Sequence, residues 1–124
     1  MPIRIQLFGI GKLKANVIRH LAPFSSDAIL DKFPLILRGR FGPSFKSKQY
    51  WTLPGVGIYK GLNKNAQKKV NKGEIVYNPK NDELIIILED QELPTKANII
   101  GEVENNLELI LKARNGLNTK ITKL

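Results

Sequence analysis

The sequence predicts a small, mainly β domain that folds as a closed or nearly closed barrel and is capped by two helices. Short strand-like runs alternate with Gly, Pro and Asn turn signals along the chain, and only two segments have helical character. In an open sheet the continuous apolar run 84–88 could form an exposed, aggregation-prone edge strand, and closure of the sheet removes such edges. With 124 residues, the chain has the length of one domain, 1–124.

The first third predicts a hairpin and a helix. Apolar residues alternate along 3–8 and again along 12–18, with a glycine turn at 9–11 between them. Residues 25–33 have the composition of a short helix. Ser25 or Ser26 is the expected N-cap, Asp27 suits the first turn, and Pro34 ends the helix.

The rest of the chain predicts six more strands and a second helix. Strands are expected over 35–41, 45–53, 74–77, 83–88 and 98–103, and 120–124 suits a short final strand. The glycine- and lysine-rich stretch 54–69 and the acidic stretch 89–97 read as loops. Asn105 or Asn106 is expected to cap a helix that carries Leu107, Ile110 and Leu111 on one face and ends at 115–116.

Composition and charge limit the functions that are open. The absence of cysteine excludes disulfides, thiolate metal sites and cysteine nucleophiles. No apolar run is long enough for a signal peptide core or a membrane span, so we expect a cytoplasmic protein without a membrane partner. The net charge is +9, and residues 1–73 hold 14 Lys and Arg but only two Asp. Such asymmetry is typical either of a nucleic-acid face or of a lysine-rich solvated surface.

No catalytic residue, metal site or cofactor is predicted. The single histidine, His20, has no serine or carboxylate placed beside it by the local sequence, and one histidine cannot form a zinc site. Acidic residues at 89, 90 and 92 lack the oxygen spacing of a calcium loop. The two Gly-x-Gly phrases, at 9–11 and 55–57, are not followed by a phosphate-binding Gly-Lys-Ser/Thr.

One group of residues supports a nucleic-acid module as an alternative function. Lysines could neutralise phosphates while aromatic rings stack on bases. The group interleaves both kinds of side chain and comprises Lys46, Lys48, Tyr50, Trp51, Tyr59, Lys60, Lys64, Lys68 and Lys69. In an alternating strand, however, Tyr50 and Trp51 point to opposite faces, so we expect at least one of them in the core.

Three phrases in chain order resemble the small cyclophilin-like proteins of archaea and bacteria, a family of minimal cyclophilin-fold barrels without an established activity. They are "LAPFSSDAILDKFPL", "VNKGEIVYNP" with "ELIIIL", and "NIIGEVENNLELILKARNGLNTKITKL". The resemblance covers nearly the whole chain and implies a cyclophilin-like barrel capped by two helices. The sequence departs from the smaller relatives at Asn78 and at Glu89-Asp90, where they often carry aromatic residues.

The resemblance does not imply strong prolyl isomerisation. The Phe-His-Arg and Gln-Phe-Phe phrases of cyclophilins are absent, and "EDQELPTK" stands where the pocket tryptophan and histidine would lie. We therefore expect a binding module for a small ligand or peptide, with a weak or altered isomerase as a further alternative and the oligomeric state left open. Arginines would clamp an anionic group and rings would form apolar walls. The predicted binding residues are Arg38, Arg40, Phe41, Tyr50, Trp51, Tyr77 and Asn78.

Overall fold

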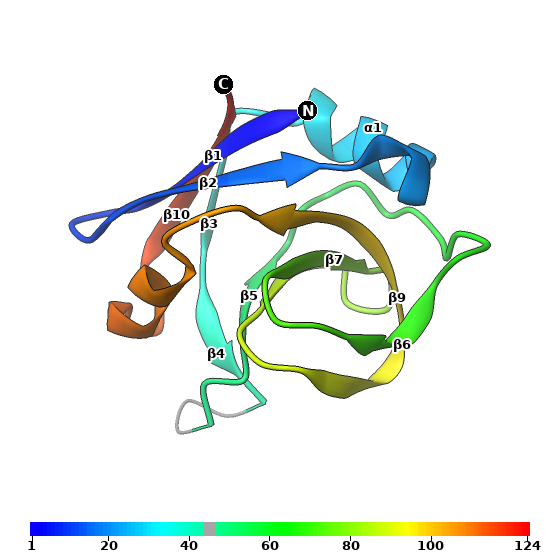
Figure 1. Cartoon of the computed structure of the whole chain (residues 1–124). Coiled ribbons are helices and arrows are strands. Elements are labelled where there is room, and N and C mark those ends of the chain that lie inside the picture. Colours follow the sequence, from blue (N-terminus) through cyan, green and yellow to red (C-terminus); the bar gives the residue numbers. More distant parts are fainter. Residues whose placement is uncertain (44–46) are drawn as a thin grey trace.

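The computed structural model describes residues 1–43 and 47–124 and is mainly β, in agreement with the predicted class (Figure 1). One α-helix and two 3-10 helices accompany the strands in this part of the chain. The strands are β1 (Pro2–Leu7), β2 (Gly11–Val17), β3 (Leu35–Arg38), β4 (Arg40–Gly42), β5 (Tyr50–Pro54), β6 (Gln67–Val70), β7 (Glu74–Asn78), β8 (Glu83–Ile87), β9 (Gln91–Val103) and β10 (Asn118–Lys123). The helices are η1 (Arg19–Leu21), α1 (Pro23–Asp31) and η2 (Leu107–Lys112).

All strand pairs are antiparallel and form one sheet in the order β3-β10-β1-β2-β9-β7-β8-β5-β4, with β6 paired to β9. The two ends of this order, β3 and β4, are consecutive in the chain and flank Gly39. Among the described residues no ladder joins β3 to β4, so the sheet is not closed and the predicted closed barrel is not confirmed.

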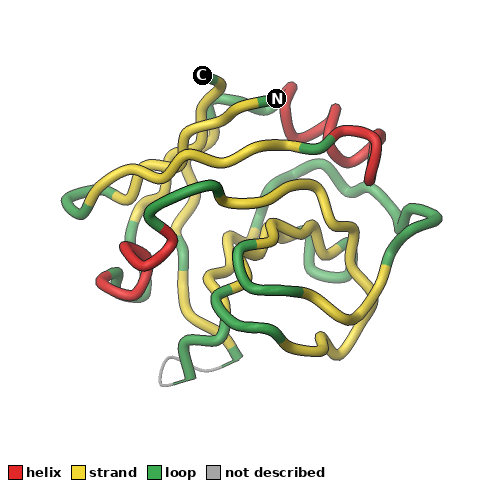
Figure 2. The backbone as a smooth tube through the Cα atoms, in the orientation of Figure 1, coloured by secondary structure: helices red, strands yellow, loops and turns green. Residues whose placement is uncertain are grey.

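The main core lies on the inner face of this curved sheet. The predicted N-terminal hairpin is confirmed: Ile3, Ile5 and Leu7 of β1 and Leu13, Ala15 and Val17 of β2 are buried, while the residues that alternate with them are not. The helix α1 covers one end of the core with Ile29 and Leu30 and lies next to η1, beyond the C-terminal end of β2, in the view of Figure 2. The alternation of the sequence therefore fixes which side of each strand faces inward.

A second, smaller core explains why β8 is apolar on both faces. Leu84 and Ile86 contribute to the main core, whereas Ile85 and Ile87 pack in a separate cluster that includes Leu93 of β9. The first half of β9 lies over the outer side of the β7–β8 hairpin to form this cluster. The expectation of an acidic loop at 89–97 is therefore wrong, because β9 begins at Gln91 and its residues alternate between exposed and buried positions.

The start of the first predicted helix differs from expectation, whereas the second begins after Asn106 as its N-cap residue, as expected. The helix α1 begins at Pro23 with Ala22 as its N-cap, so neither Ser25 nor Ser26 caps it; the Ser25 hydroxyl oxygen accepts a hydrogen bond from the Asn98 amide at 3.1 Å. The segment after Asn106 is a 3-10 helix rather than an α-helix, and it ends at Lys112, before the expected 115–116 stop. The Asn105 side chain instead accepts a hydrogen bond from the Lys14 amide.

Two further boundaries were not predicted. The expected loop over 54–69 contains the start of β6, whose residues before Val70 are all exposed and give no apolar signal. The expected strand over 45–53 begins only at Tyr50, and its residues 45 and 46 lie outside the described part of the chain. Within the part of the chain that is described, no helix has the length and apolarity that crossing a bilayer requires.

Candidate ligand-binding site

A hollow of about 420 Å³ opens on the outer side of β4, β5 and the start of β8. Strand pairing builds it: Arg40 of β4 lies opposite Thr52 of β5, and Glu83 of β8 lies opposite Pro54. Opposed residues of antiparallel strands project from the same face. The border of the hollow is formed by Arg40, Phe41, Gly42, Pro43, Tyr50, Thr52, Asn81, Glu83 and Asn115.

Glu83 is the most buried charged group in this border, with 7% of its surface exposed. The Thr52 hydroxyl donates to its Oε2 at 2.6 Å, and the Asn78 side-chain amide donates to its Oε1 at 3.1 Å. The Asn81 amide approaches Oε1 at 3.4 Å. These donors are neutral, and no ion pair within the described ranges involves Glu83. A buried carboxylate that lacks a cationic partner is a strong attractor for a cationic or hydrogen-bond-donating group.

Arg40 supplies the opposite charge on the same hollow. It is exposed on β4, which is separated from β8 by β5 alone. Two strand spacings amount to roughly 10 Å between the backbones of β4 and β8, and both side chains border the hollow that lies over these strands. Arginine is suited to this position because it binds carboxylates and phosphates through two parallel hydrogen bonds.

The charges of Glu83 and Arg40 both influence the pKa of the Tyr50 hydroxyl. Burial raises the pKa of the Tyr50 hydroxyl, the negative charge of Glu83 raises it further, and the positive charge of Arg40 opposes the change. Its ring crosses β4 at Gly42, where a Cβ atom would lie 2.1 Å from a ring carbon. The phenol therefore stays protonated well above neutral pH and offers a hydrogen-bond donor inside the hollow.

A second hollow of about 250 Å³ adjoins the first and shares Phe41 and Asn115 with it. The Asn115 side-chain oxygen accepts a hydrogen bond from the Phe41 amide at 2.9 Å, which links the two residues that separate the hollows. Lys48 lies 5.1 Å from the centre of the Phe41 ring, and Arg114 borders the same space. The joint site thus has a carboxylate at one end and a basic rim at the other.

The predicted binding residues separate into two groups. Arg40, Phe41 and Tyr50 border the hollow, and Asn78 reaches it through its hydrogen bond to Glu83. Arg38 is exposed on β3 and does not border it. The other two predicted residues lie in the core.

Both core aromatics have internal partners. Trp51 is fully buried, donates from Nε1 to the Thr119 hydroxyl at 3.3 Å and packs edge-on against Phe41 with ring centres 4.9 Å apart. Tyr77 is also fully buried, and its hydroxyl donates to the Asp82 carboxylate at 2.6 Å.

Asp82 holds the chain around 55–59 in place. Its carboxylate accepts hydrogen bonds from the amides of Gly57, Ile58 and Tyr59 as well as from the Tyr77 hydroxyl. Burial acts to raise the pKa of Asp82, but these four hydrogen bonds outweigh it and leave the pKa below its usual value. The Gly57 amide of the Gly55-x-Gly57 phrase therefore already donates to an internal carboxylate, and is not free to bind a phosphate.

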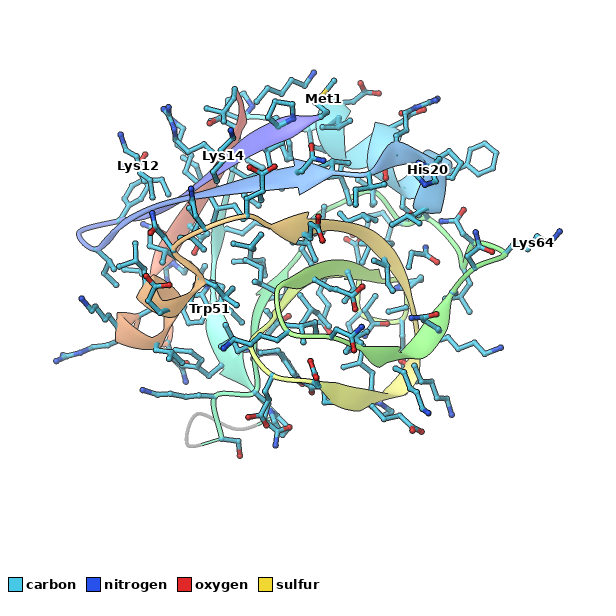
Figure 3. The ribbon with its side chains drawn as sticks, viewed as in Figure 1. Met1, Lys12, Lys14, His20, Trp51 and Lys64 are labelled. Carbon is cyan, nitrogen blue, oxygen red and sulfur yellow. The ribbon has the colours of Figure 1, made fainter. Side chains whose placement is uncertain are left out.

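The remaining sequence candidates are not gathered into a site. His20 is exposed in η1 at the edge of the molecule (Figure 3). Over residues 1–43 and 47–124, no cluster of three or more His, Asp or Glu side chains is arranged to hold a metal ion. Asp90 instead accepts a hydrogen bond from the Lys72 amide at 2.7 Å.

Sequence reasoning missed four polar residues of the hollow: Thr52, Asn81, Glu83 and Asn115. Glu83 opens a strand whose other residues are all apolar, and this isolated acid was the available signal. Asn81 lies between two expected strands and Asn115 at the expected end of the second helix, and asparagine is common at both kinds of position for backbone reasons alone.

Comparisons with known proteins concern the fold. No protein-family model and no curated protein matches this chain. Among solved structures, the hypothetical protein AF2241 from Archaeoglobus fulgidus is similar over 100% of this chain and 95% of its own, with 16% identity and a TM-score of 0.78. McbB, solved in complex with tryptophan, is similar over 98% of this chain and 44% of its own, with 11% identity and a TM-score of 0.78. These similarities establish a shared fold.

Proposed function

We propose that this protein is a binding module whose ligand is a small molecule or peptide end that carries both an anionic group and a cationic or donor group. The observation that carries the proposal is the pair of opposite charges, Arg40 and Glu83, on the border of one hollow. Arg40 would bind the carboxylate of such a ligand, and Glu83 would bind its ammonium. Phe41 and Tyr50 would contact its apolar part.

The tryptophan complex of McbB supports this ligand class. Tryptophan combines a carboxylate, an ammonium and an aromatic ring, which are the three features that Arg40, Glu83 and the two aromatic side chains would accept. The fold of McbB over the region shared with this chain is similar despite 11% identity. An aromatic amino acid or the end of a peptide is therefore the first ligand to test.

The architecture that we propose around this site is a cyclophilin-like barrel. The two ends of the sheet order are joined through Gly39, whose amide donates to the Leu117 carbonyl and whose carbonyl accepts from the Gly116 amide. A Cβ atom at Gly39 would lie 2.1 Å from the Trp51 ring, so glycine permits this crossing. We also propose that the protein has no cyclophilin-level isomerase activity.

Calorimetry with three related ligands tests the binding proposal. Tryptophan carries both charges, indole-3-propionate lacks the ammonium, and tryptamine lacks the carboxylate. We expect tryptophan to bind most tightly. Arg40→Gln should lower the affinity for tryptophan and for indole-3-propionate by about 10-fold or more, since hydrogen bonds to charged groups contribute about 1.5–3 kcal/mol.

Glu83→Gln should weaken the binding of tryptophan and tryptamine and leave the affinity for indole-3-propionate unchanged. Arg38→Gln is the matched control, because it removes an arginine two residues away that does not border the hollow. Equal losses in Arg38→Gln and Arg40→Gln would contradict the proposed site. So would an absence of binding for all three ligands and for short peptides with free ends.

A further inference from the structure

A second surface, distant from the hollow, gathers basic side chains by strand register. On the outer face of β3, β10, β1 and β2, Arg4 lies opposite Lys14, and Gln6 lies opposite both Lys12 and Lys120. At the β3 edge of this face, Arg38 lies opposite Asn118. Opposed residues share a face, so five cations project from one side of four adjacent strands. We call this the basic face: Arg4, Lys12, Lys14, Arg38 and Lys120.

Core packing fixes the position of these cations. Ile3, Ile5 and Leu7 alternate with Arg4 and Gln6 and are at most 2% exposed. A register slip of one residue would bury the cations and expose the apolar side chains, so this arrangement is strongly specified. Lys12 and Lys14 are two residues apart on β2, a spacing of roughly 7 Å, and the four strands span roughly 14 Å.

The basic face keeps most of its charge. Over the described residues only two ion pairs form, Lys14 with Glu104 at 3.6 Å and Arg19 with Asp27. The former is exposed, and such pairs contribute little to stability, so Lys14 can exchange its partner at small cost. Acidic groups near the face are Glu104, Glu102 opposite Asn16, and the terminal carboxylate of Leu124.

The surface is also concave at one place. A hollow of about 280 Å³ is bordered by Arg4, Lys12, Leu13, Lys14, Asn105 and Leu124. Figure 3 shows Lys12 and Lys14 projecting from the β1–β2 hairpin, on the opposite side of the molecule from Lys64 in that view. Three cations therefore converge on one shallow depression within a broader basic sheet.

We propose that the basic face binds the phosphate backbone of double-stranded nucleic acid. Duplex phosphates present a dense line of negative charge to which a rigid set of cations is complementary. The sequence pI of about 9.9 for the domain agrees with such a partner. This site is independent of the Arg40–Glu83 hollow and does not rest on the ligand proposed for it.

A duplex fits this face better than single strands or a membrane. Single-strand binders supply aromatic rings on which bases stack, and the only aromatic near this face among the described residues is Phe8 at the hairpin tip, which is 38% exposed. The aromatics grouped with lysines in the sequence do not add to this face: Trp51 is fully buried, Tyr50 borders the hollow, and Tyr59, which is 81% exposed, lies between β5 and β6. Membrane-surface binders bury a continuous apolar face, whereas the large exposed apolar residues here lie at separate places: Ile36 on β3, Phe8 at the hairpin tip and Leu124 after β10.

Fluorescence anisotropy with a labelled mixed-sequence duplex of about 20 base pairs, at salt concentrations from 50 to 200 mM, tests this inference. Each phosphate contact contributes about 0.9 to the slope of log affinity against log salt. The triple variant Arg4→Gln/Lys12→Gln/Lys14→Gln should therefore flatten that slope by about 2.7 and weaken binding at 50 mM at least 10-fold. These exposed substitutions keep the core intact, and a thermal melt checks the fold.

The matched control removes the same charge elsewhere. Lys60→Gln/Lys64→Gln/Lys68→Gln takes three exposed lysines from the β5–β6 segment and β6, outside the basic face. It should retain most of the affinity and a slope close to that of the unaltered protein. Equal losses in the two triple variants would overturn the proposal. It is also overturned by tighter binding to the single strand than to DNA and RNA duplexes, by binding to phosphatidylserine vesicles without duplex binding, or by no duplex binding at 50 mM salt.

Discussion

Two neighbouring carboxylates in the β7–β8 hairpin have different environments. Asp82 is 7% exposed, and three backbone amides and the Tyr77 hydroxyl donate to it. Glu83 is equally buried, yet only side-chain donors reach it and it borders an open hollow. Burial alone therefore does not distinguish a structural acid from a candidate functional one.

The difference lies in what each carboxylate holds. Asp82 fixes a chain segment whose amides would otherwise lack partners, so its hydrogen bonds stabilise the fold. Glu83 is oriented by Thr52 and Asn78 but fixes no backbone, and its charge faces the space that Arg40 also borders. We expect substitutions of Asp82 to affect stability and substitutions of Glu83 to affect binding.

The largest expected effect is on unfolding. Asp82→Asn should lower the free energy of unfolding by about 2–4 kcal/mol, because it removes charge-assisted hydrogen bonds to a buried group and turns a donor toward backbone donors. Asparagine tolerates the positive φ of 48° at this position, so backbone strain does not confuse the result. Glu83→Gln should change the free energy by less than about 1 kcal/mol, because it removes a buried charge without removing its shape. Urea denaturation measures both, and equal losses would contradict the comparison.

A smaller effect is expected at the two tyrosines. Tyr77→Phe removes the hydroxyl that donates to Asp82 and should destabilise the protein by about 1–2 kcal/mol. Tyr50→Phe should cost less than about 0.5 kcal/mol, since the Tyr50 side chain borders the open hollow. Thermal melts of the pair compare them directly. A larger loss for Tyr50→Phe would show that the hollow is structural.

The pH dependence of stability should follow the Asp82 cluster. The pKa of Asp82 is below its usual 3.8 in the folded state, so the stabilisation is complete above that value and is lost as pH falls through the lowered folded pKa. The pKa of Tyr77 is raised, first by burial and then by its hydrogen bond to Asp82, so its contribution is lost at strongly alkaline pH. Denaturation between pH 5 and pH 2 should show a steeper decline for the unaltered protein than for Asp82→Asn. Parallel curves would contradict this assignment.

The smallest expected effect concerns prolyl isomerisation. A coupled proline-isomerisation assay should give a rate close to the uncatalysed one, because His20, the chain's one histidine, lies in η1 away from the hollow, and Trp51, its one tryptophan, is buried. Glu83→Gln and Asp82→Asn should leave that rate unchanged. Strong catalysis by the unaltered protein would overturn the expectation.

Strands with clear alternation could be predicted from the sequence, and the polar site could not. The β1–β2 hairpin follows from apolar alternation, and β8 follows from a continuous apolar run of strand length. The start of β9 was missed because Pro94 and several charged residues surround Leu93 and Ala97, the two buried apolar residues of this segment, and obscure the strand pattern. Arg40, Phe41 and Tyr50 were predicted because they lie on adjacent expected strands, whereas Glu83 joins them only through the β5–β8 pairing. Trp51 was predicted as a site residue because type alone does not tell which face of a strand is inward.

The most direct test of the Arg40–Glu83 site is the set of backbone amides that respond to ligand. The measurement is a ¹H–¹⁵N NMR titration with the ligand that binds most tightly in the calorimetric series. We predict shifts in the amides of 40–42, 50–52 and 81–83, and little change in the amides of 57–59 that Asp82 holds. Shifts confined to 57–59, or spread evenly over the chain, would contradict the account.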